Sequence, residues 1–166
     1  AENDIPTLPF VAFGDLKEMR QTQFGFPAVW KAATGGYDGR GVQILRAEKD
    51  AENLPDVPGL LEEFAEGNRE LAVIVARNSV GETVCYDPVE MSFHPTANLV
   101  EYLISPAVLV PEIAENAKNI AEKTAHAFDL VGIMAVEMFL TEDGLWVNEV
   151  APRPHNSGHH TIESHY

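Results

Sequence analysis

The chain has 166 residues, a hydrophobic content of 45% and a formal net charge of −15. That hydrophobic content is enough to form a core, and the length suits one domain or two small lobes of a larger protein. The acidic balance argues against a nucleic-acid partner, because phosphate contacts need clustered Lys and Arg. Cys85 is the single cysteine, no apolar run reaches membrane-spanning length, and the start does not resemble a signal peptide. We therefore expect a cytoplasmic location and no membrane partner.

The first third of the chain predicts a capped helix followed by a β-hairpin. Asp15 and Glu18 have the spacing of a capping box, which starts a helix that Gly25 ends. Two strand patterns follow, at residues 28–33 and 42–47, and we expect them to pair with each other.

A glycine-rich loop, residues 34–41, connects these two strands. Its glycines are Gly35, Gly36, Gly39 and Gly41. Glycines allow positive φ angles, and backbone N–H groups that converge in such loops bind phosphate oxygens. Lys31 precedes the loop on a mostly apolar strand and would add a fixed positive charge. The loop matches neither of the two common phosphate-binding fingerprints, so a flexible glycine hairpin is the alternative.

The middle of the chain predicts four more strands and one long helix. The strands are expected at 60–65, 70–77, 82–91 and 99–107. The helix is expected from Pro111, with an apolar stripe at helical spacing formed by Ile113, Ala117, Ile120, Ala121, Ala125 and Phe128. Strands outnumber helices and most follow one another in hairpin order. The predicted fold class is therefore α+β (mixed α/β) with antiparallel sheets.

A second hairpin is predicted near the end of the chain. A strand pattern covers residues 132–140, and a further strand starts at Leu145. If Thr141 faces Leu145 across the loop, Glu137 lies opposite Glu149. Two opposed carboxylates among apolar neighbours repel each other, and a divalent cation with hard oxygen ligands, above all magnesium, would remove that repulsion. The alternative is a structural pair, in which a bulge displaces one glutamate or one glutamate is protonated.

The last strand continues into a segment rich in hydrogen-bonding side chains. Pro152 and Pro154 end the strand. The polar residues of the segment are Arg153, His155, Asn156, Ser157, His159 and His160. Loops of this kind commonly carry function, and a polar surface turn is the alternative.

Together, these features resemble the N5-carboxyaminoimidazole ribonucleotide synthetases, which are ATP-grasp ligases of purine biosynthesis. The similarity rests on Lys31, the glycine-rich loop, Glu137 and the run Asn-Glu-Val-Ala-Pro-Arg-Pro-His-Asn-Ser-Gly-His at residues 148–159. It implies an ATP-grasp fold of two lobes with antiparallel sheets, at residues 1–61 and 62–166. Family members carry further lobes before and after the matched stretch, so we expect this chain to be the central portion of a longer enzyme.

The resemblance also implies roles for individual residues. Contacts to ATP would come from Lys31, Gly35, Gly36, Tyr37, Asp38, Gly39, Arg40, Gly41, Glu62, Glu63, Phe64, Ala65, Glu70, His94, Asn148 and Glu149. Of these, Glu62, Glu63 and Glu70 on strand faces, and His94, also have an ordinary structural interpretation. Glu137 and Glu149 would bind magnesium. Many relatives have Glu-x-Asn at the metal, whereas Ala151 takes the third position here, so we expect a site of two carboxylates. Catalytic roles would fall to Arg153, His155 and Asn156, with Tyr37 and Asp38 near the ribonucleotide.

The activity implied by the resemblance is ATP-dependent carboxylation of 5-aminoimidazole ribonucleotide with bicarbonate, through carboxyphosphate, with ATP and magnesium as cofactors. The alternatives are a non-catalytic ATP-binding or assembly fragment, and another ATP-grasp carboxylase, such as one acting on biotin. We further expect a homodimer of the full-length protein, and little activity from this chain alone.

Overall fold

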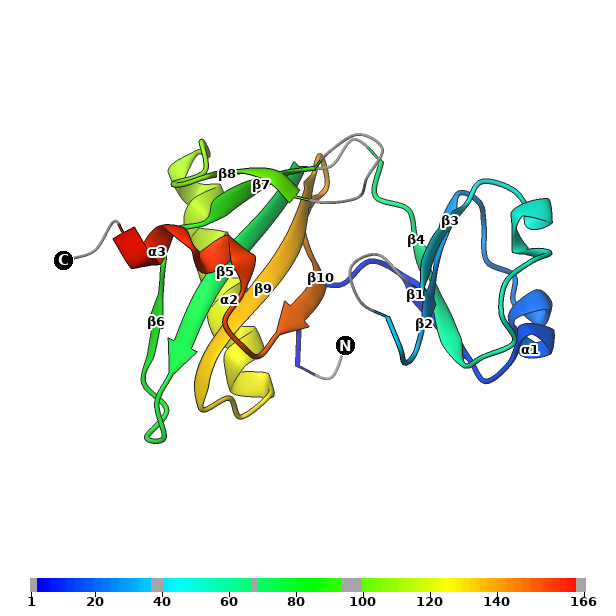
Figure 1. Cartoon of the computed structure of the whole chain (residues 1–166), viewed down its shortest axis with the longest axis horizontal. Helices are drawn as coiled ribbons and strands as arrows, with labels where there is room; N and C mark the ends of the chain where they lie inside the picture. Colours follow the sequence, from blue (N-terminus) through cyan, green and yellow to red (C-terminus); the bar gives the residue numbers. More distant parts are fainter. Residues whose placement is uncertain (1–2, 37–40, 67–68, 94–99, 164–166) are drawn as a thin grey trace. The chain divides into compact units, whose positions relative to one another are not determined.

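The computed structural model describes residues 3–36, 41–66, 69–93 and 100–163, which fold into two compact units (Figure 1). The small unit is Leu8–Glu66, and the large unit is Ala1–Thr7 with Gly67–Tyr166. Each unit contains an antiparallel sheet with helical segments. The predicted α+β class is therefore confirmed.

The small unit has a four-stranded sheet in the order β1-β4-β2-β3, with all pairs antiparallel. Its elements are β1 (Phe10–Phe13), α1 (Leu16–Gln21), β2 (Ala28–Ala32), β3 (Val42–Leu45), the 3-10 helix η1 (Glu48–Ala51) and β4 (Gly59–Glu63). The predicted hairpin of the first two strand patterns is the β2–β3 pair. The sequence places a lobe boundary between residues 61 and 62, whereas β4 pairs with β2 as far as Glu63 and lies whole within this unit.

The predicted capping box starts α1, with one change of partner. Asp15 accepts a hydrogen bond from the backbone N–H of Glu18 at 2.7 Å. The Glu18 carboxylate accepts from the backbone N–H of Gly14 at 2.6 Å, one residue earlier than the motif predicts. The helix ends ahead of Gly25, because the backbone and the hydroxyl of Thr22 both donate to a carbonyl of the last turn.

The core of the small unit lies on one face of its sheet. The buried residues of this core are Phe13, Met19, Ala28, Trp30, Leu45, Ala51, Leu54 and Leu61. Met19 comes from α1 and Ala51 from η1, so both helical segments contribute to this face. Side chains alternate along a strand. Lys31 and Glu62 therefore lie on the opposite face of the sheet.

Gly59 marks a close approach between β4 and its neighbours. A Cβ atom at Gly59 would lie 2.5 Å from the carbonyl oxygen of Lys31 and 2.9 Å from Cζ of Phe13. We expect Gly59→Ala to lower the free energy of unfolding by about 1–3 kcal/mol, because neither strand can move away without disturbing its ladder. Urea denaturation measures this loss. Gly25→Ala is the matched control, since no described atom lies within 4 Å of its Cβ position. Equal losses in the two variants would contradict the close approach.

The large unit has a six-stranded antiparallel sheet. Five of its strands follow the order β10-β9-β5-β7-β8, and β6 pairs with β5 on the same side of β5 as β7. Its elements are β5 (Arg69–Arg77), β6 (Thr83–Cys85), β7 (Val89–Phe93), β8 (Val100–Ile104), α2 (Pro111–Ala127), β9 (Gly132–Thr141), β10 (Gly144–Ala151), the 3-10 helix η2 (Asn156–Gly158) and α3 (His160–Glu163). Among the described residues, no helix is long and apolar enough to cross a membrane.

The large unit differs from the sequence expectation at three places. The single strand expected at 82–91 is the two strands β6 and β7, because Pro88, just before β7, has no N–H to donate to a ladder. The strand expected to reach residue 107 ends at Ile104, ahead of Pro106. Phe128 is 61% exposed rather than part of the apolar stripe, because α2 ends at Ala127 and the helical spacing stops there.

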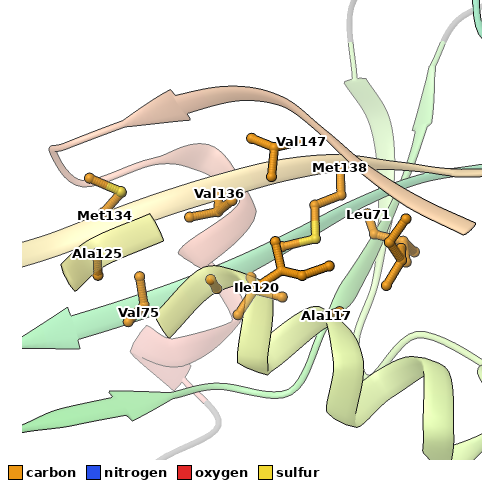
Figure 2. Close-up of a cluster of buried hydrophobic side chains, with 12 residues drawn as sticks. Leu71, Val75, Ala117, Ile120, Ala125, Met134, Val136, Met138 and Val147 are labelled. Atoms are coloured by element: carbon orange, nitrogen blue, oxygen red, sulfur yellow. The ribbon is translucent and has the colours of Figure 1, made fainter. Parts of the chain in front are cut away.

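α2 covers one face of the large sheet, and Figure 2 shows Ala117, Ile120 and Ala125 of this helix facing the strands. The strand residues of this cluster are Leu71, Val73, Val75, Met134, Val136, Met138, Leu145 and Val147. Residues that alternate with these point away from α2. That second face, called here the carboxylate face, carries Glu70 and Glu137, and a register shift in β10 turns Glu149 onto it as well.

Candidate active site

Glu137 and Glu149 are cross-strand neighbours, as the sequence predicts. The turn differs from the prediction, since Thr141 pairs with Gly144 rather than with Leu145. Gly144, which begins β10 directly after the two loop residues, has a φ of 136°, a backbone conformation that glycine adopts readily. A register shift then occurs between Val147 and Glu149, and it brings Glu149 directly opposite Glu137. This bulge at Asn148 therefore creates the carboxylate pair. In the sequence analysis, a bulge was instead the alternative that would displace one of the two glutamates.

The carboxylate face concentrates negative charge at a poorly solvated position. Glu137 is only 8% exposed. Burial raises its pKa to about 7, with further contributions from the charges of Glu149 and Glu70. The pKa of Glu70 also rises to about 7, through burial and then through Glu149. Magnesium is commonly bound by one or two carboxylates together with substrate phosphates, so the Glu137–Glu149 pair is a suitable donor set. In the described part of the chain, no group of three or more His, Cys, Asp and Glu side chains has a metal-binding arrangement. The expected magnesium site therefore remains one of two carboxylate ligands.

His155 lies against Glu137. Its Nε2 is 3.1 Å from Oε1 of Glu137, and both side chains are 11% exposed. Burial lowers the pKa of His155, and the charges of Arg153 and His159 lower it further. A neutral imidazole at this position can donate one hydrogen bond and accept another. The polar segment after β10 therefore supplies a side chain that contacts the buried carboxylate.

Arg153 and Asn156 lie on either side of His155 but make different contacts. Arg153 is exposed and donates to the carbonyl of Pro154 at 3.0 Å. Its charge acts on the site, because it lowers the pKa values of both Glu137 and His155. The Asn156 side chain accepts from the backbone N–H of Ser157 at 2.9 Å, so in this structure it supports its own turn.

Lys31 is paired within the small unit. Its Nζ lies 2.6 Å from Oε2 of Glu62, and the two side chains are 22% and 9% exposed. Each of two loop glycines has a positive φ, 78° at Gly35 and 75° at Gly41. The carbonyl of Gly41 accepts from the backbone N–H of Ala32 at 2.8 Å, which anchors the end of the loop to β2.

The other predicted site residues have varied environments. Gly36 and Glu63 are exposed, Phe64 and Asn148 are half-buried, and Ala65 is buried. Tyr37, Asp38, Gly39, Arg40 and His94 lie outside the described residues.

Comparison with known protein families matches the ATP-grasp domain over residues 1–166. The chain belongs to the ATP-grasp family. The predicted ATP-grasp fold is therefore confirmed, and so is the resemblance on which that prediction rested.

The relatives found for this ATP-grasp chain are similar over nearly all of it. The N5-carboxyaminoimidazole ribonucleotide synthase of Bacillus subtilis is 42% identical over 154 residues, covering 90% of this chain and 40% of the relative. The solved synthetase of the same name from Thermotoga maritima is 44% identical with a TM-score of 0.82, and the match covers 98% of this chain and 41% of that one. The Aspergillus clavatus synthase, solved with ADP and 5-aminoimidazole ribonucleotide, is 32% identical with a TM-score of 0.85, covering 98% and 44%. The chain thus spans about two-fifths of the length of these relatives.

Two residues beside the candidate site were not assigned a role from the sequence. Ser157 is fully buried and contacts His155. His160 lies 3.0 Å from the carbonyl of Ser157 and packs edge-on against Tyr86. Both belong to the polar segment that the sequence singled out. Composition alone does not say which of its hydroxyls and imidazoles point inward.

The raised pKa values make the stability of this ATP-grasp chain depend on pH. The pKa of Glu137 is about 7 when folded, against an ordinary 4.5, so the folded state holds a proton that the unfolded state has released. This contribution to stability is complete below about pH 4.5 and is lost as the pH rises through 7. It amounts to about 3 kcal/mol.

Glu137→Gln removes this titration. Without metal, its thermal midpoint should exceed that of the unchanged chain at pH 8 and equal it at pH 5. Glu142→Gln, at the exposed hairpin loop, is the control and should leave the pH dependence unaltered. Parallel curves for Glu137→Gln and the unchanged chain would contradict the raised pKa.

Proposed function

We propose that the protein containing this chain carboxylates 5-aminoimidazole ribonucleotide with bicarbonate and ATP, giving N5-carboxyaminoimidazole ribonucleotide, ADP and phosphate. One observation carries the proposal. A relative solved with ADP and this ribonucleotide covers 98% of the chain. The contact of His155 with Glu137, and the charge of Arg153 that lowers the pKa of Glu137, agree with such chemistry.

In this proposal, the small unit binds the nucleotide. Lys31 and the N–H groups of the glycine-rich loop contact the phosphates, where positive charge and converging amides are suited to anionic oxygens. The half-buried Phe64 and the buried Ala65 belong to the segment that holds adenine. Glu62 keeps Lys31 in place before the nucleotide arrives, since their ion pair is already formed.

The large unit holds the metal through Glu137 and Glu149. Bound magnesium would neutralise charge on the phosphoryl oxygens during transfer. Binding of a dication would also lower the pKa of Glu137, because the repulsion from Glu149 would no longer favour its protonated form. Glu70, on the same face of the sheet, is proposed to contact the ribose.

The proposed reaction has two steps. An oxygen of bicarbonate forms a bond to the γ-phosphorus while the bond from that phosphorus to ADP breaks, which gives carboxyphosphate. The exocyclic amine nitrogen of the ribonucleotide then forms a bond to the carboxyl carbon, phosphate leaves, and the amine gives up a proton. The Arg153 guanidinium stabilises the developing negative charge. His155 holds its Nε2 within hydrogen-bonding reach of Glu137 and is proposed to assist the proton transfer.

A phosphate-release assay on the intact protein tests this function. Phosphate release from ATP should require bicarbonate and rise strongly with 5-aminoimidazole ribonucleotide, with biotin as the control acceptor. The 166-residue chain alone should be nearly inactive if the rest of the protein supplies part of the site and excludes water from carboxyphosphate. Stimulation by biotin would contradict the choice of acceptor. No stimulation by any acceptor would favour a nucleotide-binding module.

Three further expectations are part of the proposal and remain predictions. They are a cytoplasmic location, a homodimer of the full-length protein, and the absence of nucleic-acid binding. Light scattering of the intact protein measures the assembly state.

A further inference from the structure

Ser157 is a buried polar residue that the proposed reaction does not use. Its exposure is 0%, and it lies in η2, the turn that follows β10. The next residue, Gly158, lies against β5, since a Cβ atom there would be 3.4 Å from Cδ1 of Ile74, an ordinary van der Waals contact. Ile74 belongs to the carboxylate face. The turn is therefore packed on the same face of the sheet as Glu137.

Two donors of Ser157 are directed at one nitrogen of His155. The Ser157 hydroxyl oxygen is 2.9 Å from Nδ1 of His155, and the Ser157 backbone N–H donates to the same Nδ1 at 3.3 Å. The backbone N–H can only donate and is shared with Oδ1 of Asn156 at 2.9 Å, so it acts together with the hydroxyl to favour an Nδ1 that accepts and carries no proton. In the neutral imidazole, the proton then lies on Nε2, which is 3.1 Å from Oε1 of Glu137. Nε2–H is therefore the group that donates to the carboxylate.

The backbone of Ser157 is held from its other side as well. A carbonyl oxygen only accepts, so His160 donates from Nδ1 to the Ser157 carbonyl at 3.0 Å. The Thr161 hydroxyl donates to the carbonyl of Gly158 at 2.7 Å. Both the side chain and the peptide groups of Ser157 therefore have defined positions relative to His155.

We infer that Ser157 is a positioning residue for the His155–Glu137 pair: it fixes the tautomer in which His155 donates from Nε2 to Glu137. A carboxylate oriented through one oxygen keeps the other for a cation, and hydrogen bonds of this kind around metal-binding side chains orient them. The tautomer itself depends only on contacts within the large unit. The relevance of this tautomer to carboxylation rests on the proposed function.

Long-range proton–nitrogen NMR of the 166-residue chain, labelled with 15N in histidine, reads the tautomer directly. The spectrum is recorded where His155 is neutral, and the loss of its signals in His155→Gln identifies them. We expect Nδ1 to show the shift of an unprotonated ring nitrogen and Nε2 that of a protonated one. A protonated Nδ1 in the unchanged chain would overturn the inference.

Ser157→Ala removes the hydroxyl and keeps the backbone N–H. We expect the two His155 nitrogen shifts to move toward each other, because the remaining backbone N–H, which is shared with Asn156, holds the tautomer less strongly than the two Ser157 groups together. Ser157→Cys, a weak donor, should give intermediate shifts and serves if the alanine variant does not fold. Thr161→Val is the matched control, because it removes a hydroxyl that bonds to Gly158, and it should leave the His155 shifts unchanged. Unchanged shifts in both Ser157 variants would overturn the role of the hydroxyl.

This experiment separates the inference from the proposed function, because it needs neither nucleotide nor turnover. If the shifts respond as expected while the intact protein carboxylates no ribonucleotide, the positioning role stands and the assigned reaction is wrong. If carboxylation is found while the shifts do not respond to the Ser157 variants, the positioning role is wrong.

Discussion

Replacing Glu149 with glutamine in the intact protein is expected to lower turnover by about 100-fold or more and to raise the magnesium concentration needed for half-maximal activity. Glu149 stands directly opposite the buried Glu137. The amide keeps the size of the side chain but removes the negative charge, so one of the two proposed anionic ligands would be lost. Steady-state rates measured across a magnesium titration show both effects at once.

Glu142→Gln is the matched control for this substitution, because Glu142 lies in the loop of the same hairpin and is exposed. It should change neither turnover nor the magnesium requirement. A fall in turnover of Glu149→Gln without any change in magnesium dependence would mean that the carboxylate pair has a role other than metal binding.

The second large effect is expected from Lys31→Ala, which should weaken nucleotide binding by about 10- to 100-fold. A hydrogen bond to a charged group contributes about 1.5–3 kcal/mol, and this variant would remove the proposed contact of that kind with the phosphates. Calorimetry of the intact protein with ADP and magnesium measures the change in affinity.

Removing Lys31 also leaves Glu62 buried without the ion pair seen at 2.6 Å, so thermal stability must be measured alongside affinity. Lys31→Arg, which keeps the charge, should retain more of the affinity. Lys49→Ala removes an exposed lysine of the same unit and should bind ADP normally. Unchanged affinity in folded Lys31→Ala would refute the assignment of Lys31 to the phosphates.

The Glu137–Glu149 pair shows both the strength and the limit of strand-pattern reasoning. Period-two alternation identified both strands, and the opposition of the two glutamates was predicted correctly. The register at the turn was wrong by one residue, since Thr141 pairs with Gly144. The bulge at Asn148 compensates for that shift. A β-bulge depends on local backbone geometry, which the alternation of apolar and polar residues does not encode.

The contacts around the polar segment were less accessible to sequence analysis. The density of Arg, His and Asn marked the segment as functional, yet the burial of Ser157 follows from the packing of its turn against β5. The 2.6 Å pair of Lys31 and Glu62 likewise depends on β2 lying beside β4, which are separated in sequence by β3. Contacts between strands distant in sequence follow from tertiary pairing, which a residue pattern alone leaves open.

Transfer of an oxygen from bicarbonate to phosphate is the central claim of the account, and isotope labelling measures it most directly. The intact protein is supplied with ATP, magnesium, 5-aminoimidazole ribonucleotide and bicarbonate labelled with 18O and 13C. If bicarbonate attacks the γ-phosphorus, one 18O should appear in the released phosphate while 13C enters the ribonucleotide. Phosphate that carries no 18O from bicarbonate, or a ribonucleotide that gains no 13C, would contradict the account.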